Sequence, residues 1–156
     1  MAEYSAPVRD IEFALEHVAD LSALSGFEAF AHADVNMVRG VVDEAARFMN
    51  DVVGPLNRVG DVEGSTWHDG EVRTPTGFKE AYARYVEAGW GGVPFDPAYG
   101  GGGFPWLVAT ALLEMLASAS MAFSMGPLLT QGAIDMLAHH ADETQREVFL
   151  PKMVLG

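Results

Sequence analysis

Residues Gly89–Pro105 read GWGGVPFDPAYGGGGFP, and this stretch decides how the chain is organised. It holds seven glycines and three prolines within 17 residues. Because proline fixes φ and glycine permits positive φ, the run predicts a defined path of turns in place of a helix. Neither G-x-G-x-x-G nor G-x-x-x-x-G-K-[ST] occurs in it, which disfavours a phosphate-binding loop. We therefore expect a structural crossing between helices.

Helical periodicity dominates on both sides of this crossing. Asp34 can cap a helix with apolar side chains at i, i+3, i+4 and i+7, and Pro55 is expected to kink or end that helix near its last turn. A second helix is predicted from about Pro75 to Ala88, with Gly89 as its C-terminal cap. A third is predicted over Trp106–Ser118. These three helices would form the framework of the domain.

Proline and polar residues also predict where the later helices begin and end. Gly126-Pro127 is expected to break the chain, with Pro127 in the first turn of a fourth helix that reaches about His140. Asp142-Glu143-Thr144-Gln145 fits a capping box at the start of a short fifth helix, which Pro151 would stop.

The pattern as a whole predicts an all-α fold, an orthogonal or up-down helical bundle with an N-terminal helical extension. We expect the extension at residues 1–33 and the main helical domain at residues 34–156. The segment Gly60–Pro75 is a polar loop with a short extended stretch around Glu71–Arg73. The extension is expected to hold one amphipathic helix and a second, very short one, both packed on the main body, and their apolar residues are Ile11, Phe13, Leu15, Val18, Phe27 and Phe30.

Composition narrows the classes of partner. The chain has 156 residues, of which 49% are hydrophobic, enough for one domain with a core. Its 22 acidic residues against nine Lys and Arg give a net charge of −13, which disfavours nucleic acid and anionic membranes as partners. The absence of cysteine excludes disulfides and thiolate metal sites. Met1–Tyr4 lacks the pattern of a signal peptide, so we expect a cytoplasmic location.

One segment, Phe104–Met125, has the length and apolarity of a candidate membrane span. Its single charge, Glu114, lies mid-segment, where it would cost about 2.5–3.5 kcal/mol on insertion. No Lys or Arg flanks either end. A helix buried within the protein is therefore the better interpretation, and no membrane partner is expected.

Few residues fit a catalytic or metal-binding pattern. Asp135, His139 and Glu143 follow i+4 spacing beside His140, but a predicted helix boundary at Ala141-Asp142 would separate them, so no metal site is expected. Glu114 has no plausible partner in the sequence and is not assigned a catalytic role. No nucleophile-elbow motif surrounds the serines and the threonine of this region, so we interpret them as small packing residues. They are Ser118, Ser120, Ser124 and Thr130.

A methionine-rich segment follows the crossing. Core packing is the commoner role of such residues, but Gly126 and Gly132 leave room beside them, so a slot for an alkyl chain is the alternative. No Lys or Arg occurs from Tyr85 to Gln145, so side-chain cations of this stretch cannot hold a phosphate. The apolar residues concerned are Met115, Met121, Phe123, Met125, Leu128, Leu129, Met136 and Leu137. The aromatic residues expected to pack in the core and the crossing are Tyr82, Tyr85, Trp90 and Trp106.

Three segments together resemble the N-terminal helical domain of the FAD-dependent acyl-CoA dehydrogenases. Phe78–Trp90 followed by Pro97–Gly103 is similar to the helix, Gly-aromatic step and glycine-rich crossing of that family. Met121–Pro127 resembles its acyl-cavity helix junction, and Asp142–Pro151 its closing helix. The opening Tyr4–Phe13 resembles the subgroup with an extended N-terminus, the 3-methylmercaptopropionyl-CoA dehydrogenase-like enzymes. His140-Ala141-Asp142 stands where the family has a glycine.

The resemblance implies an oxidoreductase of fatty acid metabolism that desaturates an acyl-CoA substrate and passes electrons to an electron-transferring flavoprotein. A middle β-domain and a C-terminal helical domain would supply most FAD contacts, the catalytic glutamate and the homo-oligomer. We expect this chain to be a truncated fragment without those domains, with no catalytic residue of its own, no stoichiometric FAD and no activity alone. The residues implied to face the acyl chain are Met125, Gly126, Leu128, Leu129 and Gly132.

A second hypothesis belongs to a different class of function. An acidic α-helical domain with an apolar face could be a stand-alone module for protein interaction or dimerisation. The two hypotheses differ in that only the first requires further domains for activity.

Overall fold

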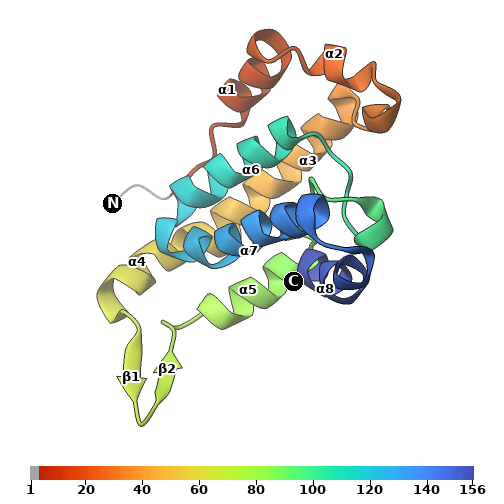
Figure 1. Ribbon diagram of the computed structural model, residues 1–156. Helices are drawn as coiled ribbons and strands as arrows, with labels where there is room; N and C mark the ends of the chain where they lie inside the picture. The colour runs from red at the N-terminus through yellow and green to blue at the C-terminus, as the bar shows by residue number, and fades with distance from the viewer. Residues whose placement is uncertain (1–3) are drawn as a thin grey trace.

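Residues 4–156 are described by the computed structural model, and helices make up most of them (Figure 1). The elements in chain order are α1 (Val8–Phe13), a π-helical turn (Ala14–Val18), α2 (Leu21–Ser25), a 3-10 turn (Glu28–Phe30), α3 (Val35–Phe48), a π-helical turn (Met49–Val53), α4 (Gly54–Glu63), β1 (Thr66–His68), β2 (Glu71–Arg73), α5 (Phe78–Glu87), 3-10 turns (Trp90–Gly92 and Pro97–Tyr99), α6 (Trp106–Ala119), α7 (Met121–His140) and α8 (Glu143–Leu155). In Figure 1, α3, α6 and α7 run side by side, and the β1–β2 hairpin projects from the body. The predicted all-α class is confirmed.

The first long helix begins as the sequence predicts but does not end there. The Asp34 carboxylate caps α3 by accepting hydrogen bonds from the backbone N–H groups of Asn36 (2.8 Å) and Met37 (2.9 Å). The predicted end near Pro55 is wrong, because the chain stays helical to Glu63. The π-helical turn precedes this proline, which therefore falls in the first turn of α4, where its fixed φ and missing N–H are tolerated.

The predicted break at Gly126-Pro127 is also wrong, since α7 is continuous from Met121 to His140. The chain breaks earlier, at Ser120, whose hydroxyl accepts a hydrogen bond from the backbone N–H of Phe123 at 3.3 Å. Pro127 is buried inside the helix, so tertiary packing offsets the cost of about 3 kcal/mol that a helix-interior proline carries.

The last helix, α8, also begins as predicted and continues past its proline. The predicted capping box is confirmed, with Asp142 and Gln145 exchanging hydrogen bonds at its start. Pro151 does not stop the helix, which continues to Leu155. Its neighbours Leu150 and Val154 are 0% and 4% exposed, and their burial holds the last turns in place.

The glycine-rich stretch forms the predicted crossing. Gly89 adopts φ +72° directly after α5, as a C-terminal cap requires. Further along, Gly101 lies so close to the Phe95 carbonyl oxygen that a Cβ would stand only 2.1 Å from it. The backbone N–H of Gly102 donates to the Gly92 carbonyl oxygen at 3.0 Å, which closes the loop on itself. Only glycine permits this close approach of two backbone segments.

The predicted polar loop contains more regular structure than expected. The extended stretch at Glu71–Arg73 is confirmed as β2, but its antiparallel partner β1 was missed. Asp69 and Gly70 join the strands with φ of +50° and +84°, the signature of a type I′ hairpin turn. The loop also starts later than Gly60, because α4 reaches Glu63.

The N-terminal extension shares the main core. Ile11 and Leu15 are buried in the same cluster as the apolar side of α3, so the expected packing of the first short helix on the main body is confirmed. The second, at Glu28–Phe30, has no buried residue, and Phe27 before it is 62% exposed. The expected burial of Val18 is wrong, since it is 76% exposed. The phenol of Tyr4 donates a hydrogen bond to the Met115 carbonyl oxygen at 3.1 Å, which ties the extension to α6.

The candidate membrane segment is divided between two helices. Ser120 separates α6 from α7, and within residues 4–156 no helix has both the length and the apolarity to cross a membrane.

Candidate functional site

Helix α7 carries an exposed apolar stripe. Leu129 is 74% exposed and Met125 is 51% exposed. This exposure is unusual, because the helix that carries them is nearly free of charged residues. The i+3 and i+4 spacings place these side chains on one face of the helix. We call this the outward face of α7, and it consists of Met121, Met125, Leu128, Leu129, Gly132 and Met136.

All five sequence-predicted site residues lie on α7 and are exposed. The structure places Met125, Leu128, Leu129 and Gly132 on the outward face, whereas Gly126 lines a groove beside it. A Cβ built on Gly126 or on Gly132 would meet no atom within 4 Å, so both glycines border open space.

A groove of about 410 Å³ lies between α5 and α7. Its floor is aromatic, because the buried Phe123 ring of α7 stands 6.0 Å from the ring of Phe78 and 6.4 Å from that of Tyr82, measured between centroids. We call it the α5–α7 groove, and it is lined by Thr74, Phe78, Lys79, Tyr82, Ala122, Phe123 and Gly126.

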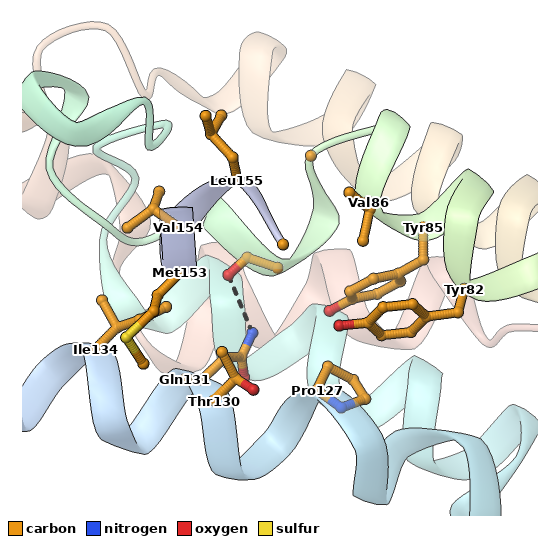
Figure 2. A pocket seen from close by; sticks show the side chains of 13 residues that line it. Tyr82, Tyr85, Val86, Pro127, Thr130, Gln131, Ile134, Met153, Val154 and Leu155 are labelled. Carbon is orange, nitrogen blue, oxygen red and sulfur yellow. Dashed lines mark hydrogen bonds between the residues drawn. The ribbon is translucent and has the colours of Figure 1, made fainter. Parts of the chain in front are cut away.

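Tyr82 also lines a small, partly open cavity of about 20 Å³, seen from close by in Figure 2. The rings of Tyr82 and Tyr85 stack 6.3 Å apart at 20°, and their hydroxyls point into the cavity. Gln131 reaches across it, donating from Nε2 to the Gly91 carbonyl oxygen at 3.4 Å. The cavity has room for about one water molecule.

The position of Tyr85 fixes its protonation. Burial raises the pKa of its phenol well above the ordinary value of 10.0, and the neighbouring Tyr82 raises it further. Tyr85 therefore stays neutral at physiological pH and does not act as a base. The sequence predicted packing roles for both tyrosines and gave no sign of the cavity between them.

The remaining candidate residues have structural roles. The predicted helix boundary after His140 is confirmed, and within residues 4–156 no three His, Cys, Asp or Glu side chains gather as a metal site would need. The Nδ1 atom of His139 lies 3.5 Å from a carboxylate oxygen of Asp135. Glu114 is exposed on α6, where it helps to raise the pKa of Tyr4 after the larger effect of burial.

Comparison with known proteins decides the family. Residues 35–156 match the model of the acyl-CoA dehydrogenase N-terminal domain, which covers all of α3 to α8. The chain belongs to the acyl-CoA dehydrogenase family. This confirms the resemblance carried by the crossing, the Met121–Pro127 segment and the closing helix.

Three curated relatives show the same relationship. The chain is 36% identical to 3-methylmercaptopropionyl-CoA dehydrogenase of Ruegeria pomeroyi, over 98% of this chain and 26% of that protein. It is 32% identical to butyryl-CoA dehydrogenase of Syntrophomonas wolfei, again over 98% and 26%. A broad-specificity linear acyl-CoA dehydrogenase, FadE5, of Mycobacterium tuberculosis is 31% identical over 80% of this chain and 21% of its own length. The chain thus spans about a quarter of the length of these relatives.

Acyl-CoA dehydrogenases such as these relatives generally depend on FAD. The most enclosed cavities of the described residues have volumes of about 10 to 20 Å³, far below the size of a flavin. The larger hollows are open surface grooves that cannot enclose a flavin, although Arg73 and Lys79 line one of them. These residues do not fit a flavin by themselves, so no flavin-binding residue is assigned to this chain.

Proposed function

We propose that this chain is the N-terminal, substrate-side domain of a flavin-dependent acyl-CoA dehydrogenase, an enzyme that desaturates an acyl-CoA thioester between its α and β carbons. FAD and the catalytic carboxylate would belong to the middle and C-terminal domains of the enzyme, and the chain alone would be inactive. Electrons would pass to an electron-transferring flavoprotein, and the enzyme would be a cytoplasmic homo-oligomer.

The outward face of α7 is the observation that carries this proposal. An exposed stripe of leucine and methionine is costly in water, at about 25 cal/mol per Å² of apolar surface, and such a stripe is a typical sign of a contact surface. We assign to the acyl-chain wall the residues Met125, Gly126, Leu128, Leu129 and Gly132.

The chemistry of this face defines the role of the domain. It presents methyl, methylene and thioether groups, and the helix that carries it contains no Lys or Arg. Such a surface can exclude water and orient an alkyl chain, but it cannot transfer a proton. In the proposed enzyme, the domain positions the substrate and leaves the chemical step to other groups.

A chimeric enzyme tests the proposal. Residues 1–156 would replace the matching quarter of the Ruegeria pomeroyi relative, and FAD content and acyl-CoA oxidation would be measured for the chimera and for the chain alone. We expect both properties in the chimera and neither in the isolated chain. Stoichiometric FAD and turnover in the isolated chain would contradict the proposal.

Point variants of the chimera test the role of α7. Replacing Leu129 with Asp places a charge in the apolar wall and should lower kcat/KM for an acyl-CoA by ~10-fold or more. Val62→Asp is the matched control, because Val62 is 67% exposed and lies on α4, outside the proposed acyl-chain wall. Equal effects of the two variants would refute the assignment. An inactive chimera together with saturable binding of the chain to a protein would favour the interaction-module hypothesis.

A further inference from the structure

We propose that the α5–α7 groove is a binding site for a single alkyl carboxylate, a ligand distinct from an acyl-CoA thioester. The alkyl chain would lie on the aromatic floor, and the carboxylate would face Lys79 and Arg73. This inference is independent of the proposed function, because it requires no flavin and no further domain. Gly126 is the one residue that the groove shares with the proposed acyl-chain wall.

The size and lining of the groove suit an alkyl chain. Its volume of about 410 Å³ falls within the range of about 300–1,000 Å³ that is common for small-molecule sites. Phe78 is half-buried, Phe123 is buried and Tyr82 is 39% exposed, so the groove presents ring faces and edges to a ligand. Alkyl groups pack well on such surfaces, whereas a fully polar ligand would leave its hydrogen bonds unmade.

The charge at one end of the groove selects an anion. Lys79 lines the groove, where no acidic residue accompanies it, and the adjoining hollow is lined by Arg73 and Lys79 together with Glu80. Among the described residues, no carboxylate oxygen lies within 4.0 Å of either cation, as holds for every Lys and Arg except Arg39 and Arg47. Two unpaired cations beside an apolar groove, in a chain of net charge −13, complement a ligand with an apolar body and an anionic head.

Gly126 keeps the groove open. Glycine inside a helix is destabilising relative to alanine, so a role in packing or in ligand binding is needed to explain Gly126 in α7. Packing within the domain supplies none, since a Cβ at this position would meet no atom within 4 Å. That Cβ would instead project into the groove, where it would take space from a ligand.

An NMR titration with sodium decanoate, below its micelle concentration, tests the proposal on the 156-residue chain. We expect saturable shifts at the backbone amides of Tyr82, Phe123 and Gly126, and NOEs from decanoate methylenes to the Phe78 and Tyr82 rings. Decyltrimethylammonium has the same alkyl chain with the opposite charge. It should bind the groove more weakly than decanoate, although a chain of net charge −13 attracts cations in general.

Two pairs of variants identify the site. Gly126→Leu should abolish the decanoate shifts, whereas Gly40→Leu should preserve them, because Gly40 is also a helical glycine with no atom within 4 Å of its Cβ position, but lies on α3. Lys79→Gln should weaken decanoate binding by ~3-fold, as expected for one exposed ion pair. The matched control is Lys152→Gln, which changes the only other lysine, on α8.

Three results would overturn the proposal. They are an absence of shifts at the groove, equal or tighter groove binding of the ammonium amphiphile, and decanoate shifts confined to the outward face of α7. Only the last would bear on the acyl-chain wall, so the failure of this proposal is distinguishable from a failure of the chimeric enzyme.

Discussion

Helices α6 and α7 follow each other directly and have similar compositions, yet they meet opposite environments. Neither contains Lys or Arg. Helix α6 buries Val108 and Met115 completely, at 0% exposure, whereas α7 leaves Met121 and Leu129 at 60% and 74%. The difference teaches that apolar composition alone does not distinguish a core helix from a contact surface. The neighbouring elements cause this difference, because α6 contacts both α3 and α7, whereas the outward face of α7 is exposed within residues 4–156.

The largest expected effect is on the stability of variants in the buried helix α6, compared with variants on the outward face of α7. Met115→Ala should lower the free energy of unfolding by about 2–5 kcal/mol, since it opens a cavity around a fully buried side chain. Leu129→Ala should change it by no more than about 0.5 kcal/mol, because the side chain is exposed. Urea unfolding of both variants measures the difference. Similar losses would mean that the outward face of α7 is covered in solution.

A second prediction concerns the boundary between the two helices. Ser120→Ala removes the hydroxyl that caps α7 and should cost about 1 kcal/mol of unfolding free energy. Ser118→Ala is the control, since Ser118 is exposed on α6 and caps no helix in the described chain. Thermal unfolding of both variants tests this. A loss as large for Ser118→Ala would show that the cap is not responsible.

A third prediction has the opposite sign. Gly126→Ala should stabilise the chain by up to about 1 kcal/mol, because a free Cβ position in a helix interior favours alanine. In the crossing, Gly101→Ala should destabilise it, because its Cβ would stand 2.1 Å from the Phe95 carbonyl oxygen. Denaturant unfolding distinguishes the two cases. A destabilised Gly126→Ala variant would show that the α5–α7 groove is narrower than described.

The smallest effect at neutral pH comes from Tyr85→Phe, which removes a hydroxyl that has no hydrogen-bond partner among the residues of Figure 2. The folded-state pKa of Tyr85 is raised above the unfolded value of about 10. Its contribution to stability is therefore complete below pH 10 and is lost as the pH rises above 10. Tyr85→Phe should reduce this alkaline loss. Unfolding measured from pH 7 to 11 tests it, and an unchanged pH profile would contradict burial of the phenol.

Local signals were predicted well from the sequence. The caps at Asp34 and Asp142, the role of Gly89 and the crossing itself depend on the conformational limits of single residues, which are the same in any fold. Pro55 was predicted to kink or end a helix, Pro127 to begin one and Pro151 to end one. The chain stays helical through all three, because a π-helical turn or tertiary burial offsets their local cost. The hairpin strand Thr66–His68 was missed because all its residues are exposed and show no apolar alternation.

The sequence by itself determined the all-α class, the positions of most helices and the family resemblance. It also determined the acidity of the chain and the lack of Lys and Arg in its apolar segment. These properties follow from periodicity, charge and motif order. Only the tertiary structure decided which apolar residues are buried. It placed Gly126 in the α5–α7 groove, made Tyr82 part of the lining of both the groove and the small cavity, and left Leu129 exposed. The physical reason is that burial depends on residues far apart in the chain, and no local pattern encodes which of two apolar helices will be covered.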